Sequence, residues 1–187
     1  MNTTTIIILA VLALLIIILI ALYNRLNIRR NQIENAKSSL DALFIKRVDL
    51  IPNLITVVKE YTSYERDVLD KITQLRANSQ KDRQSTEYQH DSDLSSAVRQ
   101  LMVQVENYPE LKANSQFTNL AYSWNEVEEQ IAAGRRYLAA SITYYNDAVR
   151  TFPSNAIAGM FGFKSHEWER ATQEQRKAIN ADELFKK

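Results

Sequence analysis

An unbroken apolar run near the start of the chain constrains its fold more than any other feature. Residues 6–22 read IIILAVLALLIIILIAL, and no side chain before Arg25 carries a charge. A helix from Thr3 to Tyr23 would be roughly 30 Å long, which is enough to cross the hydrocarbon core of a bilayer. A cleaved signal peptide is the alternative, but it would have a basic leader and small residues at its cleavage site. We therefore expect residues 1–23 to be an uncleaved transmembrane anchor.

The charges beside this anchor predict its orientation. Arg25, Arg29 and Arg30 follow the apolar run, whereas the preceding flank MNTTT has only its amino group. The positive-inside rule then places the N-terminus outside and the rest of the chain in the cytoplasm. The same three arginines are predicted to contact anionic lipid next to the membrane. An ordinary solvated helix face is the alternative interpretation.

Beyond the anchor, apolar residues recur at helical spacing, and only three Gly and three Pro occur among 187 residues. We predict an all-α protein in which the anchor continues into a long antiparallel four-helix bundle, residues 24–153, followed by a C-terminal tail, residues 154–187. Asn114 or Ser115 is the predicted N-cap of the last bundle helix. The bundle helices are predicted over residues 24–49, 52–78, 93–108 and 115–152, with a polar connection between the second and the third.

Proline residues set the predicted helix boundaries. Pro52 lies within the apolar stretch KRVDLIPNLITVVKEY, residues 46–61. Inside a helix it would remove one backbone hydrogen bond and cost about 3 kcal/mol, whereas the first turn of a helix tolerates it. We therefore predict a turn at Asp49, Pro52 and Asn53 that ends one helix and begins the next, with a kink in one long helix as the alternative. Further breaks are predicted at Tyr108, Pro109 and Pro153.

Four sequence blocks follow the anchor in a characteristic order: YNRLNIRRN, RVDLIPNLITVVKEY, ENYPELKAN and YYNDAVRTFPSNAIAGMFGFK. Together they resemble the LemA family of bacterial membrane proteins, over about Tyr23 to Lys164. The resemblance implies a single N-terminal transmembrane segment in the bacterial plasma membrane and a cytoplasmic-type helical bundle. The resemblance does not imply an enzyme, because the family has no settled biochemical activity. Family members often carry two Tyr-Asn pairs a heptad apart, whereas here Leu138-Ala139 replaces the first and only Tyr145-Asn146 remains.

The sequence offers little support for catalysis or for nucleic-acid binding. It has no Cys and two His, and its 23 basic side chains nearly balance 22 acidic ones. Glu87-x-x-His90 has the spacing of half a di-iron site, but no second such motif is present. His166-Glu167 lacks the second histidine of a zinc hydrolase motif, and no G-x-S-x-G or phosphate-binding glycine loop occurs. We predict a protein that is no enzyme and has no metal, cofactor or nucleic-acid partner.

Candidate interaction residues lie on the last bundle helix. Three acids, at positions 126, 128 and 129, precede Arg135 and Arg136, which indicates either pairing within the helix or pairing across a subunit boundary. Tyr144 and Tyr145 cannot both face one core, so at least one of them should be available to a partner; otherwise such tyrosines are core residues whose hydroxyls reach water. The candidate contacts are therefore Tyr144, Tyr145, Asn146, Arg135 and Arg136.

These features predict a membrane-anchored, non-enzymatic scaffold that self-assembles through its helical bundle, with the lipid bilayer and copies of itself as partners. The first and last bundle helices exceed the third in length, which leaves apolar surface for a neighbouring copy. The alternative is a sensor or adaptor that binds an unidentified peptide or protein in a groove beside the third helix. The apolar segment AIAGMFGF, residues 156–163, is expected either to cover the end of the bundle or to touch lipid or another subunit.

Overall fold

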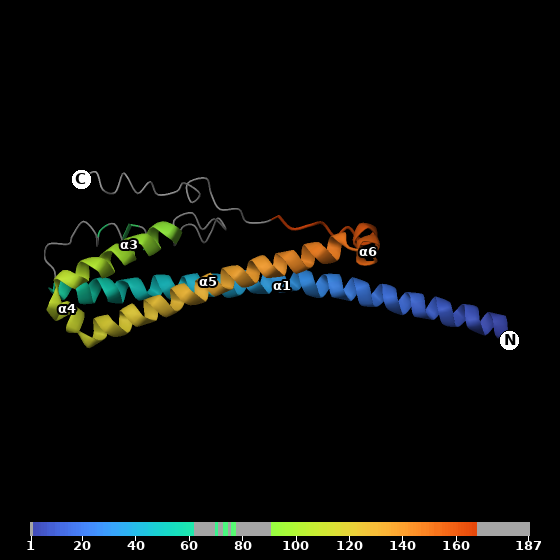
Figure 1. Cartoon of the computed structure of the whole chain (residues 1–187), viewed down its shortest axis with the longest axis horizontal. Helices are drawn as coiled ribbons and strands as arrows, with labels where there is room; N and C mark the ends of the chain where they lie inside the picture. Colours follow the sequence, from blue (N-terminus) through green and yellow to red (C-terminus); the bar gives the residue numbers. More distant parts are fainter. Residues whose placement is uncertain (1, 62–69, 71–72, 75, 78–90, 168–187) are drawn as a thin grey trace. The chain divides into compact units, whose positions relative to one another are not determined.

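The computed structural model describes residues 2–61, 70, 73, 74, 76, 77 and 91–167, and all regular structure in these ranges is helical. The predicted all-α class is therefore confirmed for this part of the chain. The chain folds into two compact units. Unit 1 comprises Met1–Asn35 with Tyr137–Lys187, and unit 2 comprises Ala36–Arg136. The elements are α1 (Thr3–Tyr61), α3 (Asp91–Gln104), the short 3-10 helix η1 (Val105–Asn107), α4 (Pro109–Ala113), α5 (Ser115–Arg150) and α6 (Ser154–Phe161) (Figure 1).

Helix α1 continues through Pro52, so the predicted turn at Asp49, Pro52 and Asn53 is wrong. The physical reason is burial on both sides of the proline. Val48, Ile51 and Leu54 are each at most 1% exposed in the core of unit 2. Burial of such side chains stabilises by about 1.5–3 kcal/mol each, which together exceeds the roughly 3 kcal/mol that an interior proline costs. The two helices predicted on either side of Pro52 are therefore one helix as far as Tyr61, and the predicted end at residue 78 lies outside the described residues.

The core of unit 2 joins one face of α1 to α3, η1, α4 and the first half of α5. Its buried members recur in steps of three and four along each long helix, which is the pattern of an amphipathic helix. Gly134 lies so close to Leu40 that an added Cβ would approach its Cδ1 to 3.0 Å. The buried cluster consists of Val48, Ile51, Leu54, Val57, Val58, Leu94, Ala97, Val98, Leu101, Val105, Leu111, Phe117 and Trp124.

The break predicted at Tyr108 and Pro109 is confirmed. Tyr108 has φ −121° and ψ 84°, outside the helical region, and Pro109 occupies the first turn of α4. The short α4 itself is a feature that the sequence pattern does not predict. The predicted cap of the next helix is also confirmed, because Asn114 Oδ1 accepts hydrogen bonds from the backbone N–H groups of Gln116 at 2.8 Å and Phe117 at 3.1 Å.

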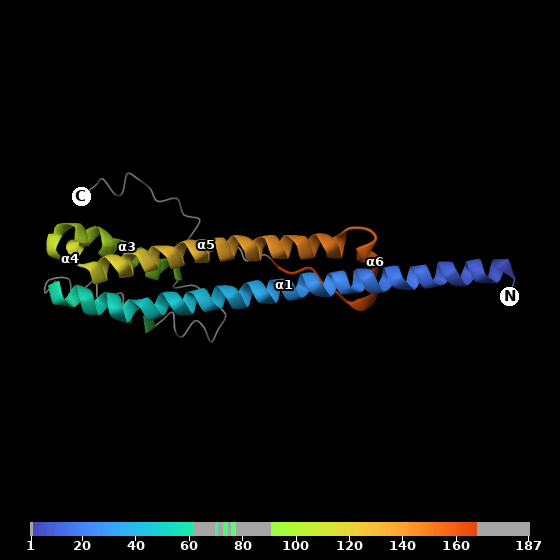
Figure 2. The same cartoon turned by 90° about the horizontal axis from the view of Figure 1, so that it is seen from below.

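Unit 1 contains the apolar N-terminal part of α1, the second half of α5, and α6. Helix α5 ends at Arg150, and α6 begins directly after Pro153, so the predicted break there is confirmed. Both Figure 1 and Figure 2 show α6 beside α1. Leu26 of α1 forms a buried cluster with Ile157 and Ala158 of α6. The segment 156–163 therefore packs on α1.

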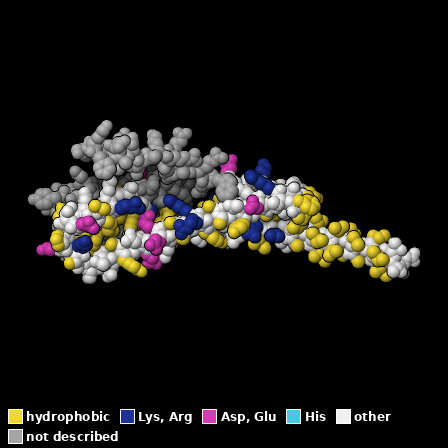
Figure 3. Space-filling model, viewed as in Figure 1, with side chains coloured by type: hydrophobic (Ala, Val, Ile, Leu, Met, Phe, Trp, Pro, Cys, Tyr) yellow, Lys and Arg dark blue, Asp and Glu magenta, His cyan; other side chains and the backbone are white. Residues whose placement is uncertain are grey.

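The apolar run at the start of α1 is exposed from Ile6 to Ala21, and its last residue, Leu22, is half-buried. Its large aliphatic side chains, from Ile6 to Ile20, are 43–63% exposed, and they form a continuous hydrophobic surface (Figure 3). Mean hydropathy reaches 3.5 in an 18-residue window of this helix, and no residue of that window is buried within the protein. By length and composition, this helix can cross a membrane. The described residues include one such helix.

Candidate functional site

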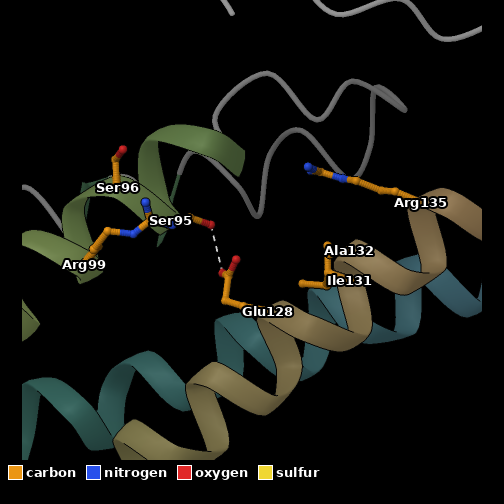
Figure 4. A pocket seen from close by; sticks show the side chains of 7 residues that line it. All are labelled: Ser95, Ser96, Arg99, Glu128, Ile131, Ala132 and Arg135. Carbon is orange, nitrogen blue, oxygen red and sulfur yellow. Dashed lines mark hydrogen bonds between the residues drawn. The ribbon is translucent and has the colours of Figure 1, made fainter. Parts of the chain in front are cut away.

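A polar pocket of about 260 Å³ lies between α3 and α5 in unit 2 (Figure 4). Helix α3 contributes three of its lining residues and α5 contributes four. Arg135, one of the predicted interaction residues, lines this pocket, whereas Arg136 is exposed and does not. The lining residues are Ser95, Ser96, Arg99, Glu128, Ile131, Ala132 and Arg135.

A buried ion pair borders this pocket. Arg47 of α1 is 1% exposed, and its Nη1 donates to Glu128 Oε1 at 2.9 Å and to Ser95 Oγ at 2.9 Å. Ser95 Oγ in turn donates to the same Glu128 oxygen at 2.8 Å. The Arg47 guanidinium also lies 5.4 Å from the ring centroid of Phe44 and 5.8 Å from that of Trp124, within the range of cation–π attraction.

Burial lowers the pKa of Arg47 below its ordinary value, and the Glu128 carboxylate opposes this shift by charge attraction and a hydrogen bond. Glu128 therefore has a partner on α1, which neither interpretation of the acidic cluster on α5 included. Glu126, a second acid of that cluster, accepts a hydrogen bond from Gln130 at 2.9 Å. Arg99 and Arg135 bring two guanidinium groups to the pocket lining, and that of Arg135 lies 5.7 Å from the ring centroid of Phe44.

The apolar periodicity of α1 indicates that Arg47 is buried, although Arg47 was not among the predicted site residues. Arg47 falls on the stripe Leu40, Phe44, Arg47, Ile51 and Leu54, whose steps of three and four place all five on one helix face. A cation on an apolar stripe indicates a buried partner, since an unpaired charge is costly to bury. The stripe could therefore have predicted a buried acid opposite Arg47, although not which one.

Tyr145 and Asn146 form a structural clamp rather than an exposed contact. Tyr145 is 4% exposed, and its hydroxyl donates to the Lys164 carbonyl at 3.0 Å. Asn146 is 2% exposed; its Nδ2 donates to the His166 carbonyl at 3.0 Å and its Oδ1 accepts from the His166 N–H at 2.8 Å. Burial raises the pKa of Tyr145, and the charge of Arg30 opposes the rise. Because both side chains bind the segment after α6 within unit 1, their prediction as partner contacts is corrected.

Tyr144, by contrast, points outward. It is 57% exposed, and the Arg29 guanidinium lies 5.1 Å from its ring centroid. One heptad earlier, Tyr137 is 50% exposed and its hydroxyl accepts a hydrogen bond from Gln32 at 3.1 Å. The prediction that one of the two adjacent tyrosines faces away from the core is confirmed. Its role in binding stays a prediction, as does the contact of Arg25, Arg29 and Arg30 with lipid.

The described residues contain no group of three or more His, Asp or Glu side chains that could hold a metal ion. Glu87 and His90 lie outside the described residues. His166 serves the clamp through its backbone, and its Nδ1 lies 2.9 Å from the carbonyl oxygen of Glu167.

Comparison with known proteins gives one family and two kinds of relative. A model of the LemA family matches residues 36–182. The chain is 27% identical to Protein LemA of Metamycoplasma hominis over 164 residues, which cover 86% of this chain and 74% of that protein. It is 31% identical over 78 residues to magnetosome protein MamQ 2 of Paramagnetospirillum magneticum and to magnetosome protein MamQ of Magnetospirillum gryphiswaldense. The latter matches cover 42% of this chain but only 29% of each relative.

Proposed function

The chain belongs to the LemA family, and from this premise we propose that it is a membrane-anchored, non-enzymatic scaffold that self-assembles through its helices at the bacterial plasma membrane. One observation carries the proposal: α1 runs from Thr3 to Tyr61 without a break. Its first part exposes an apolar surface that only a bilayer or another apolar partner can cover. Its later part supplies buried side chains to the folded core. The same helix thus contains both the apolar N-terminal segment and residues of the folded core.

A surface in unit 1 supports self-assembly. Ile28 is 65% exposed and lies one turn from Gln32, which binds Tyr137, while the neighbouring Arg29 lies over Tyr144. These contacts bring the exposed rings of Tyr137 and Tyr144 beside Gln32 and the half-buried Arg29, next to the exposed Ile28 on α1. Aromatic and arginine side chains are enriched where protein interfaces gain most of their binding energy. We call Ile28, Arg29, Gln32, Tyr137 and Tyr144 the tyrosine patch.

Light scattering of the detergent-extracted full-length protein tests self-assembly. At micromolar concentration we expect a mass of at least two chains, and we expect Tyr137→Ser with Tyr144→Ser to lower it. Tyr122→Ser is the matched control, because Tyr122 is also exposed on α5 but lies outside the tyrosine patch. A strictly monomeric wild-type protein would rule out the scaffold. An equal loss of mass in the control would rule out the patch as the interface.

The pocket between α3 and α5 favours a second function, that of an adaptor for a peptide or protein partner. Its position beside α3 and its two arginines, Arg99 and Arg135, suit an acidic side chain or a C-terminal carboxylate of a bound peptide. Arg47 and Ser95 each donate one hydrogen bond to the Glu128 side chain at the pocket edge, and Arg47 also donates to Ser95. A preorganised site of this kind needs little rearrangement on binding.

A panel of acidic peptides, measured by calorimetric titration, tests the adaptor. Arg99→Ala or Arg135→Ala should then weaken binding about tenfold or more, as expected for loss of a charged hydrogen bond worth about 1.5–3 kcal/mol. Arg136→Ala is the control, because Arg136 is exposed next to Arg135 but does not line the pocket. An equal effect of all three substitutions would indicate nonspecific charge attraction and reject the site.

A further inference from the structure

Helix α6 and the residues around it expose several large apolar side chains. Phe152, just before α6, is 86% exposed, and Met160 and Phe161 within it are 75% and 59% exposed. Ser154, Ile157 and Ala158 are the buried residues of the helix. No charged side chain occurs from Thr151 to Phe163, although Arg150 and Lys164 flank this stretch. The segment thus has apolar side chains on two sides, one buried against the protein and one uncovered.

The uncovered side lies where the apolar run of α1 ends. The ring of Phe161 is 4.9 Å from that of Tyr23, measured between centroids, and the ring of Phe163 is 5.7 Å from it. Leu22 and Leu26 of α1 pack in the same cluster as Ile157 and Ala158. Leu22 is the last residue of the apolar run and Tyr23 follows it. Helix α6 is therefore fixed at the level of α1 where a membrane-spanning segment would meet the headgroups.

The clamp and the end of α6 hold it there. Tyr145 and Asn146 of α5 bind the backbone of Lys164 and His166 through three hydrogen bonds. Gly162 adopts φ 73°, and the Phe163 N–H donates to the Ala158 carbonyl at 2.9 Å, which terminates the helix. The exposed apolar side chains consequently sit on a rigid support and not on a loose tail.

We propose that α6 is a second membrane contact, a short helix that inserts Phe152, Met160 and Phe161 into the leaflet from which α1 emerges. Aromatic rings are favoured at the boundary between headgroups and acyl chains, where Tyr23, Phe161 and Phe163 meet. Arg25 follows Tyr23 by two residues, Arg150 and Lys164 flank the α6 segment in the sequence, and such cations suit anionic headgroups. With α1, this contact fixes the rotation of unit 1 about the α1 axis, which a single span cannot do. The inference rests on the proposed anchorage of α1 but not on self-assembly.

Single-cysteine spin labels test the contact, because the chain contains no Cys. The full-length protein is reconstituted in vesicles of phosphatidylethanolamine with a minority of phosphatidylglycerol. Labels are placed at Met160→Cys and, in a second variant, at Phe152→Cys. Ile16→Cys serves as the lipid reference, and Ala139→Cys, an exposed site on α5 in the same unit, serves as the aqueous control. Power saturation compares the access of membrane-soluble oxygen with that of a water-soluble nickel complex.

We expect the ratio of oxygen access to nickel access at both α6 labels to be several-fold higher than at position 139 and to approach that at position 16. A ratio equal to the aqueous control at both labels would overturn the proposal. Shielding of both labels from both reagents would also overturn it, because a second copy of the chain would then cover α6. An aqueous ratio at position 16 would refute the anchorage itself, and the α6 contact with it. These outcomes do not depend on the oligomer mass measured by light scattering, so the α6 contact and self-assembly can fail separately.

Discussion

Single residues in this protein show how burial changes the role of a charged or polar side chain. Arg47 is 1% exposed, whereas the side chain of its partner Glu128 is 30% exposed. The two ends of the ion pair are therefore not equivalent. Water can solvate Glu128 if Arg47 is removed, but it cannot reach Arg47 if Glu128 is removed. A buried cation that loses its partner is expected to cost more than an exposed anion that does so.

We expect Glu128→Ala to lower the free energy of unfolding by about 3 kcal/mol, since it leaves a buried charge uncompensated. Arg47→Met should cost only about 1 kcal/mol, the value of a lost hydrogen bond, because the methionine fills the apolar site and Glu128 becomes hydrated. Urea unfolding followed by tryptophan fluorescence, to which buried Trp124 contributes, measures both changes. Glu129→Ala, at an exposed position on the same helix, is the control and should change stability by less than about 0.5 kcal/mol. The reverse order of the two effects would contradict this account.

Tyr145 predicts a loss of stability in alkaline solution. Its pKa is raised above the ordinary value of 10.0 chiefly by burial, so folding favours the neutral phenol. The stabilisation from this group is complete below pH 10 and declines as the pH rises from there through the raised pKa. At neutral pH, Tyr145→Phe should be less stable by about 1 kcal/mol, because the bond to the Lys164 carbonyl is lost. In more alkaline solution the melting temperatures of Tyr145→Phe and wild type, measured by circular dichroism, should move closer together. The exposed Tyr144→Phe is the control, and the difference between its melting temperature and that of wild type should stay the same at every pH.

At the scale of the element, α1 shows tertiary burial overriding a local helix breaker. Pro52 lies within the helix, and Thr56 Oγ1 donates to its carbonyl at 2.8 Å. The helix still lacks the backbone hydrogen bond that a proline cannot donate. The neighbouring Val48, Ile51 and Leu54 retain the helical path because each is buried on the same face. The proline therefore reduces the stability of a helix that the core maintains.

Pro52→Ala should accordingly stabilise the protein, by on the order of 1–2 kcal/mol. The variant gains stability because the alanine N–H can form the missing helical hydrogen bond. Part of this gain is lost because alanine gives the unfolded chain more conformational freedom than proline does. Pro109→Ala is the matched control, because Pro109 lies in the first turn of α4, where a helix tolerates proline. The control should lose about 0.4–1 kcal/mol. The urea midpoints of the two variants, compared with that of wild type, test whether Pro52 lowers the stability of α1. A lower midpoint for Pro52→Ala would show instead that Pro52 favours the native backbone.

For the whole molecule, the charge distribution along α1 predicts how the chain is oriented in a membrane. Arg25, Arg29 and Arg30 follow the apolar run within eight residues of its end, whereas no charged side chain precedes it. Moving these cations across the bilayer during insertion is unfavourable relative to moving the uncharged N-terminal flank. The folded part is therefore expected on the cytoplasmic side.

Single cysteines on either side of the predicted membrane span, one at position 2 and one at position 139, check this orientation. In intact spheroplasts, a membrane-impermeant maleimide should label Asn2→Cys but not Ala139→Cys, since both positions are exposed in the fold and only the first should face outward. Permeabilising the membrane should make the second site reactive, which shows that it is accessible on its own side. Labelling of position 139 in sealed spheroplasts would place the folded part outside the cell.

Features that depend on neighbours along the chain are those that sequence patterns predict. Apolar periodicity predicted α5, proline and capping rules predicted its start at Asn114 and the break at Tyr108, and the run 6–22 predicted an apolar helix. Tertiary structure decided the features that depend on distant partners. Arg47 meets Glu128 across 81 residues, and Asn146 meets His166 across 20, so no local pattern specifies either pair. The continuity of α1 through Pro52 also depends on distant partners. Burial against other helices stabilises the continuous helix by more than the proline destabilises it.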